Sequence, residues 1–240
     1  MTKTYYQDGL VMPAHAHNFT SISIVLGGRL SEKVGSRTVV GGSVQTIIKP
    51  SGVMHENFFS KDSYVLSLAL KETDFLNTRK FEVLEEWDWF AGLESIGFFS
   101  GLLKCSNENQ QADILRHWMQ YLSGNVERST GMLVPPWLLE VKDYLDQHFH
   151  DEVRSDFLAE MFNVHRVYLA RAFRKYFGAS VKEYLNALRV HNATGAVVMH
   201  EESLTRIALE NGFSDQSHFN RHFKKATAIT PSELRALTKS

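Results

Sequence analysis

The stretch GFSDQSHFNRHFKKATAITPSELR, residues 212–235, decides how the C-terminal part of this sequence folds. Gly212 tolerates the positive φ angle of a tight turn and stands between two short helical patterns. In the second pattern Phe219 and Phe223 lie four residues apart, so both rings fall on one helix face. Residues 230–233, TPSE, form a capping box with proline in the first turn of another helix. The stretch therefore predicts a helix-turn-helix followed by a capped helix.

The same pattern occurs once more, in DFLAEMFNVHRVYLARAFRKYFG at residues 156–178. When the two segments are aligned on their second helices, LARAFRK lies over FNRHFKK, and apolar, arginine, phenylalanine and basic positions coincide. Ala159 and Ala208 are small enough to let the two helices of each pair cross closely, and Asn163 takes the turn position of Gly212. The C-terminal part is therefore predicted to contain two helix-turn-helix units.

A long helix is predicted between the two units. Ser180 and Glu183 form a capping box at its start. Its length of about 20 residues corresponds to roughly 30 Å. Successive major-groove openings on one face of B-DNA are about 34 Å apart. One chain is therefore expected to place one helix from each unit in adjacent turns of the groove.

The outward faces of the second helices carry side chains suited to DNA. In the later unit the predicted base-reading residues are Gln216, Ser217, Asn220 and Arg221, which suit adenine and guanine edges. In the earlier unit they are Arg166, Val167, Ala170 and Arg171, a face poorer in hydrogen-bonding groups. The predicted phosphate contacts are Arg174, Lys175, Lys224 and Lys225. We expect the later unit to specify sequence, and the earlier one to contact the backbone and thymine methyl groups.

Ile207 and Ala208, the run 212–225 and the run 230–235 closely resemble the signature of AraC/XylS-type transcription regulators. The resemblance covers the C-terminal part without a large gap. It implies sequence-specific binding to double-stranded DNA as a homodimer, control by a small-molecule effector, and contact with RNA polymerase if the protein is an activator. Ala228 departs from the pattern, because the family usually has glycine at this place. A helical protein-interaction domain is the alternative.

Composition places the chain among folded soluble proteins. Its 240 residues are 43% hydrophobic and 22% charged, and this length suffices for two domains with separate cores. The net charge of −1 argues against nonspecific binding of nucleic acid over the whole protein surface, but it permits a local basic face. No stretch approaches the ~20 apolar residues needed to cross a bilayer, and the N-terminus lacks a signal-peptide pattern. We therefore expect a cytoplasmic protein without a membrane partner.

The N-terminal part has a different periodicity. From about residue 14 to residue 70, runs such as SISIVL and YVLSLAL alternate, and glycines separate them at the spacing of a small antiparallel sandwich or barrel. From about residue 72 to residue 123 the pattern is helical. Pro136 ends a stretch of turn formers and suits the first turn of a helix. The predicted organisation is an all-β, cupin-like domain with C-terminal helices over residues 1–123, a linker over 124–136, and an all-α domain over 137–240.

An aromatic segment lies within the predicted helices and includes Trp87, Trp89, Phe90, Phe98 and Phe99. One interpretation is that these rings seal the open side of the β-domain. The other is a subunit interface, since helices between a sensing and a DNA-binding domain are a natural place for a two-fold contact. The sequence alone leaves both interpretations open.

Three histidines mark a candidate ligand site in the β-domain. His15 and His17, in HAHNF, are expected to project from one face of a strand, and His55 ends the stretch PSGVMH on another strand. Three imidazole nitrogens suit a divalent metal such as zinc. Glu56 is the neighbouring carboxylate, but strand alternation turns it away from His55.

The pattern of these histidines is similar to that of cupins, which AraC-type regulators commonly carry as effector domains. The resemblance implies either a divalent metal or a small organic effector, such as a sugar or an aromatic acid, beside His15, His17 and His55. The cupin pattern also has a glutamate, which falls near Ser21 or Ile22 and is missing here. Metal cupins include enzymes, but an enzyme has no need of a duplicated DNA-reading module. We therefore expect a regulator without catalytic activity.

Overall fold

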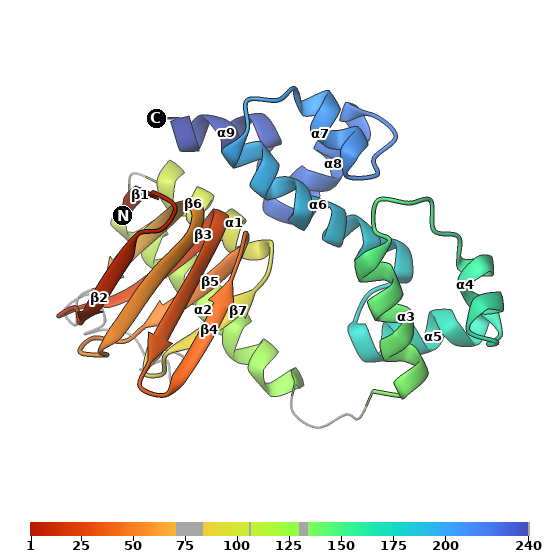
Figure 1. Cartoon of the computed structure of the whole chain (residues 1–240), viewed down its shortest axis with the longest axis horizontal. Helices are drawn as coiled ribbons and strands as arrows, with labels where there is room; N and C mark the ends of the chain where they lie inside the picture. Colours follow the sequence, from red (N-terminus) through yellow and green to blue (C-terminus); the bar gives the residue numbers. More distant parts are fainter. Residues whose placement is uncertain (71–83, 106, 130–133, 240) are drawn as a thin grey trace.

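The computed structural model describes residues 1–70, 84–105, 107–129 and 134–239 (Figure 1). The N-terminal part forms an antiparallel sheet, and helices follow it to the C-terminal end, as predicted. The predicted helical residues 72–83 lie outside the described residues.

The sheet is built around two long strands that run side by side. β3 and β6 pair antiparallel over residues 20–33 and 56–70. The pairing is irregular around Gly28, where a φ of 93° and the close approach of the Asp62 carbonyl require glycine. The strands are β1 (Thr2–Tyr6), β2 (Val11–His15), β3 (Thr20–Val34), β4 (Arg37–Gly41), β5 (Gln45–Lys49), β6 (His55–Leu70) and β7 (Asp88–Ala91). Their order is β1-β6-β3-β5-β7, with β2 paired to β6 and β4 paired to β3.

Two parts of the sheet differ from the prediction. The strands begin at Thr2 rather than near residue 14, because β1 pairs with β6. β7 lies within the segment predicted to be helical, and it pairs with β5. Trp89 and Phe90 of β7 pack into apolar clusters on opposite faces of the sheet. Because both faces of this strand are apolar, its sequence lacks the alternation that identifies a strand.

The helices follow the predicted boundaries closely in the C-terminal part. They are α1 (Glu94–Lys104), α2 (Glu108–Ser129), α3 (Pro136–Gln147), α4 (Ser155–Met161), α5 (Arg166–Phe177), α6 (Val181–Met199), α7 (Leu204–Glu210), α8 (Gln216–Thr227) and α9 (Pro231–Lys239). Pro136 occupies the first turn of α3, as expected. Residues 124–129, expected in the linker, instead continue α2. The turn formers of this stretch therefore do not end the helix where we predicted.

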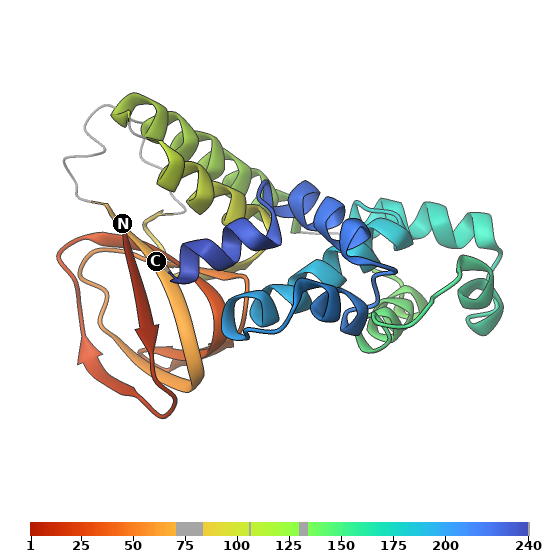
Figure 2. The same ribbon diagram turned by 90° about the horizontal axis from the view of Figure 1, so that it is seen from above.

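Two separate apolar cores hold the helices. The larger core joins one face of the sheet to α1, α2 and the elements from α6 to α9, and in it Ile22 and Ile24 of β3 belong with Phe219 and Phe223 of α8. The smaller core joins α3, α4, α5 and the start of α6 around Phe173. The pair α7 and α8 therefore lies near the sheet, whereas α4 and α5 lie at the other end of α6 (Figures 1 and 2).

The aromatic residues of the intermediate segment are packed within this chain. Phe98 and Phe99 are buried in the larger core, and the Phe98 ring stacks on Trp118 of α2 with 4.3 Å between centroids. Trp87 and Trp89 pack against the opposite face of the sheet. The arrangement is that of rings which seal the β-domain from both sides.

The caps of the two predicted units recur at equivalent positions. α5 ends at Gly178 and α8 ends at Ala228, both in the left-handed conformation, with φ angles of 71° and 62°. Two residues later Ser180 opens α6 with a complete capping box. Thr230 opens α9 in the same way, because its hydroxyl and Glu233 exchange hydrogen bonds with each other's backbone. The backbone thus repeats itself, although the left-handed position holds glycine in one unit and alanine in the other.

We predict that Ala228→Gly stabilises the protein by about 1 kcal/mol, because a left-handed conformation carries a steric cost for every residue with a Cβ atom. Urea denaturation measures the change. The matched control is Ala236→Gly in the interior of α9, which costs about 1 kcal/mol through loss of helix propensity. A destabilised Ala228→Gly variant contradicts the conformational argument.

Hydrogen bonds from the Thr230 backbone N–H and hydroxyl, with Lys104 nearby, lower the pKa of Glu233 to about 2. A depressed folded-state pKa adds stability above the unfolded value of about 4.3, and this stability is lost as the pH falls toward 2. We predict that the stability difference between the wild type and Glu233→Gln shrinks over this pH range. Urea titrations at several pH values test this, with Glu140→Gln on α3 as an exposed control. A difference independent of pH contradicts it.

Candidate functional site

Two helix pairs, α4 with α5 and α7 with α8, share one turn geometry. The turns contain Asn163 at a φ of 48° and Gly212 at 77°, the two positions predicted to need a positive φ. The next residue in each turn donates its backbone N–H to the carbonyl of the predicted small alanine, Ala159 at 2.9 Å and Ala208 at 3.0 Å. Both alanines are buried. The two pairs therefore position their second helices, α5 and α8, in the same way.

α5 presents an exposed face with the predicted residues. Leu169 and Phe173 are buried in the smaller core. The four residues predicted to read bases, Arg166, Val167, Ala170 and Arg171, are all exposed, as are Arg174 and Lys175. Two of the arginines are engaged in exposed ion pairs, Arg166 with Asp156 at 3.2 Å and Arg174 with Glu183 at 3.0 Å. Such exposed pairs are weak and exchange readily for another anion.

α8 buries Phe219, Phe223 and Thr227 along one face. Of the side chains predicted to contact DNA, Ser217, Arg221, Lys224 and Lys225 are exposed. Asp215 caps the helix start by accepting the His218 backbone N–H at 2.7 Å. The helix therefore carries an exposed face that is basic and lies opposite the apolar one.

Two of the four α8 side chains predicted to read bases are less exposed than expected. Gln216 is half-buried and accepts a hydrogen bond from the Thr205 hydroxyl at 2.7 Å. Asn220 is also half-buried, and its side-chain oxygen is shielded from solvent without a hydrogen-bond partner among the described residues. At about 100° per residue, Asn220 lies beside the row formed by Phe219 and Phe223, whereas Arg221 lies on the opposite side. Spacing along the helix groups these side chains, but it does not say where the core lies.

Two basic residues near these helices were not predicted. Arg189 of α6 donates to the carbonyls of Phe149 at 2.6 Å and Asp151 at 2.8 Å, and so holds the loop between α3 and α4. Lys182, exposed at the start of α6, contributes to lowering the pKa of His218 and His222 on α8, after the larger effects of burial and nearby groups. It therefore adds positive charge beside α8. Both residues lie in the helix that we treated only as a spacer.

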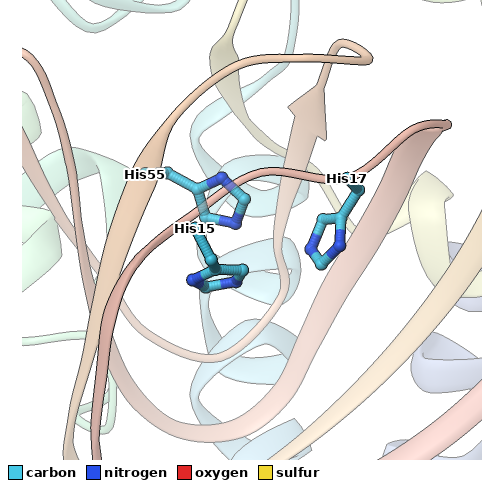
Figure 3. A group of neighbouring side chains, drawn as sticks. All are labelled: His15, His17 and His55. Atoms are coloured by element: carbon cyan, nitrogen blue, oxygen red, sulfur yellow. The ribbon is translucent and has the colours of Figure 1, made fainter.

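The three predicted histidines come together in the β-domain. His15 ends β2, His17 follows it, and His55 begins β6 opposite His15. Their rings face one another (Figure 3), with centroid distances of 4.3 Å between His15 and His55 and 5.2 Å between His17 and His55. One ligand nitrogen from each ring lies within 4.8 Å of the others. Glu56 points away and pairs with Lys33 at 3.4 Å, as strand alternation predicted.

The local backbone sets the tautomer of two of these rings. The Nδ1 atoms of His15 and His55 lie 2.7 Å and 2.9 Å from the carbonyl oxygens of Pro13 and Val53. Because a carbonyl oxygen only accepts, both Nδ1 atoms carry a hydrogen, so that in the neutral form of each ring the lone pair is on Nε2. These Nε2 atoms are shielded from solvent and have no partner among the described residues. Histidines that bind metals are held in this way by their second nitrogen.

A buried ion pair beside the histidines was not predicted. Glu32 of β3 is fully buried, and its carboxylate accepts from the Lys49 ammonium at 3.1 Å and from the Trp87 indole N–H at 2.5 Å. Asn57 donates to the same carboxylate at 2.8 Å when its amide nitrogen faces Glu32. Burial is the largest cause of a lowered pKa at His55, where Lys49 and Glu32 act with opposite signs. Glu32 and Lys49 lie on two separate strands, so no local sequence pattern indicates that they pair.

Comparison with known proteins shows which family the C-terminal part is similar to. A family described as "Helix-turn-helix domain" matches residues 158–237. The HTH-type transcriptional activator RhaS of Escherichia coli O139:H28 is 36% identical over 92 residues, which are 38% of this chain and 33% of RhaS. An uncharacterised HTH-type transcriptional regulator of Staphylococcus aureus strain MSSA476 is 28% identical over 134 residues, 56% of this chain. The chain spans only 18% of that relative's length.

Solved structures of similar proteins also match this chain. An AraC-type DNA-binding domain protein from Chromobacterium violaceum is 29% identical, with 43% of this chain and 92% of the other covered, at a TM-score of 0.40. ToxT from Vibrio cholerae covers 100% of this chain and 98% of its own at 9% identity, with a TM-score of 0.43.

Among the described residues, no helix is long and apolar enough to span a membrane. The matched family covers the second half of α4 and the elements from α5 to α8, and relatives of this chain are named as transcription regulators. Together with the signature at residues 207–235, these findings identify residues 158–237 as a helix-turn-helix domain of the AraC type, similar to domains of transcription regulators.

Proposed function

We propose that the chain is a sequence-specific transcription regulator which reads two adjacent major-groove segments with α5 and α8. The observation that carries this proposal is the repeated backbone: two helix pairs with equivalent turns and caps lie on either side of α6. α6 spans 19 residues, or about 28 Å, close to the ~34 Å between successive groove openings. The exposed basic side chains near the ends of both second helices, Arg174, Lys175, Lys224 and Lys225, are the phosphate contacts.

The two units contribute differently. α8 offers Arg221 and Ser217 for hydrogen bonds to base edges, with Gln216 and Asn220 available only after small rearrangements at the edge of the core. α5 offers Arg166 and Arg171 together with Val167 and Ala170, which suit phosphates and thymine methyl groups. The unit containing α8 specifies sequence, and the unit containing α5 adds affinity.

The N-terminal domain is the effector domain in this proposal, a cupin-like barrel with its ligand near His15, His17 and His55. Opposite faces of the same sheet serve the two functions. The face with Ile22 and Ile24 packs toward α6 and α8, and the histidines lie apart from this shared core. An effector alters transcription by binding differently to two arrangements of sheet and helices.

The histidine site fits a divalent metal ion. Two buried Nε2 lone pairs lack a partner among the described residues, and their Nδ1 atoms are fixed by carbonyls. His15, His17 and His55 hold the ion in this proposal, and the ion offers an electrophilic position to an effector oxygen. Burial lowers the pKa of His17 and of His55, which keeps both rings in the neutral form that binds metals.

We further propose a homodimer, and contact with RNA polymerase if the protein activates transcription. The role is regulatory rather than catalytic, because the site offers histidines for binding and the rest of the chain is organised around DNA contact. DNA affinity distinguishes this proposal from a helical protein-interaction domain. Binding to mixed-sequence DNA weakens steeply with salt if phosphates are contacted, and a helical interaction domain shows no such binding.

We predict that Arg221→Ala loses ~1–3 kcal/mol of binding at particular base pairs, whereas Lys225→Ala weakens all sequences about equally. Both side chains are exposed on α8, and Lys225 lies on its last turn. Fluorescence anisotropy with a selected site and its single-base variants measures both effects. The reverse pattern means that the face of α8 which reads bases has been assigned incorrectly.

We predict that protein purified without a His-tag binds about one divalent ion per chain, and that His55→Ala abolishes this binding. Mass spectrometry of the metal content gives the stoichiometry. His117→Ala is the control, because that side chain is exposed on α2 and bonds its own helix backbone. A stoichiometry near zero in the wild type after incubation with zinc ends the metal proposal.

A further inference from the structure

The polar cluster beside the histidines continues into an apolar one on the same strands. On β6, His55, Asn57 and Phe59 are buried at every second position, so their side chains share one face. The same spacing of two residues separates Glu32 from Leu30 on β3 and Lys49 from Ile47 on β5, so each of these pairs also shares one face. Leu30, Ile47 and Phe59 form one apolar cluster, with Tyr6 stacked on Phe59 at 4.1 Å between centroids. This face of the sheet therefore has a polar end and an apolar end.

Lys49 carries hydrogen-bonding capacity that its ion pair does not use. Its side chain is 11% exposed, and its ammonium has three N–H donors. Glu32 is its hydrogen-bond partner among the described residues. Glu32 itself also accepts from the Trp87 indole and the Asn57 amide, so neutral donors already satisfy part of its charge. An almost fully buried ammonium with spare donors favours an anionic partner.

The net charge at the polar end of this sheet face also favours an anionic ligand. Glu32 and Lys49 carry opposite charges, and a histidine that binds a metal ion does so in its neutral form. A divalent ion at the histidines leaves a net positive charge, and a neutral effector does not compensate it. An anionic oxygen satisfies the metal and Lys49 together.

We propose that the effector is a small organic carboxylate. Its acidic group binds between Lys49 and the metal held by His15, His17 and His55, and its apolar part lies toward Phe59. The inference rests on the proposed effector site and names the class of molecule that this site takes. Lys49 is the residue that selects a negatively charged effector over a neutral one.

Benzoate serves as the probe and benzamide as its neutral analogue of the same shape. The full-length protein, loaded with Co²⁺, is titrated with each, and visible absorption of the cobalt and calorimetry report binding. We expect benzoate to change the cobalt spectrum and to bind at least tenfold more tightly than benzamide. The loss of one charged hydrogen bond corresponds to a change of about tenfold to hundredfold.

Two double variants test the role of Lys49. Lys49→Met with Glu32→Gln removes the pair without leaving a buried charge, and we expect it to bind Co²⁺ but to lose at least tenfold in benzoate affinity. Lys33→Met with Glu56→Gln removes the exposed ion pair on the same two strands as Glu32 and Asn57, and we expect wild-type affinity. Thermal melting of both variants checks that they fold.

The outcomes separate this inference from the proposals it rests on. If Co²⁺ binds but benzamide binds as well as benzoate, or if the Lys49 double variant keeps the wild-type affinity, the carboxylate inference is overturned and the metal site stands. If Co²⁺ does not bind, the metal proposal fails, and calorimetry on the metal-free protein still decides whether benzoate is preferred over benzamide. Equal binding of inorganic phosphate and benzoate shows a general anion site and also overturns the inference.

Discussion

The larger apolar core is the constraint on which the rest of the structure depends. β3, β5 and β6 bury one face against α1, α2 and the C-terminal helices, with Ile22, Ile24 and Ile48 of the sheet in the same cluster as Phe219 and Phe223 of α8. Burial of this kind contributes roughly 25 cal/mol for each Å² of apolar surface, so separating the two parts is costly. The sheet and the second helix pair therefore behave as one packed body.

The two helix pairs differ because of this core. The pair α7 and α8 is built into it, whereas α4 and α5 have their own core around Phe173 and reach the rest of the chain through α3 and α6. The sheet shares a core with α8, whereas α5 is connected to that core through α6. This asymmetry suits a regulator in which the unit proposed to read sequence is the one closest to the proposed effector domain. In that arrangement the sheet connects the proposed effector site to the core that contains α8.

Local signals in the sequence predicted the C-terminal part well. The capping box of Ser180 and Glu183 and the turn positions Asn163 and Gly212 act over a few residues, so their outcome follows from residue chemistry alone. β7 was missed because Trp89 and Phe90 face two different apolar clusters, which removes the alternation of a strand. Tertiary packing, rather than a local sequence pattern, therefore makes this segment a strand.

The histidine site was predicted only in part, for a similar reason. His15, His17 and His55 are found from two short motifs, but Glu32 and Lys49 are single residues on different strands. The register pairs Lys49 with Ser21 and Glu32 with Asn57, so Glu32 and Lys49 become neighbours only through the tertiary fold of the sheet. Asn220 shows the same limit on α8, where helical spacing grouped it with Arg221 although the core shields its side-chain oxygen. Which side of an element is buried depends on contacts distant in sequence.

The central claim is that one chain reads two turns of the major groove, and protection of guanine N7 from methylation tests it most directly. A binding site for the full-length protein is first selected from random-sequence DNA. The account predicts two clusters of protected guanines on one face of the duplex, separated by one helical turn of about 10 base pairs. A single protected cluster per bound chain, or a bound site in which no guanine N7 is protected, contradicts it.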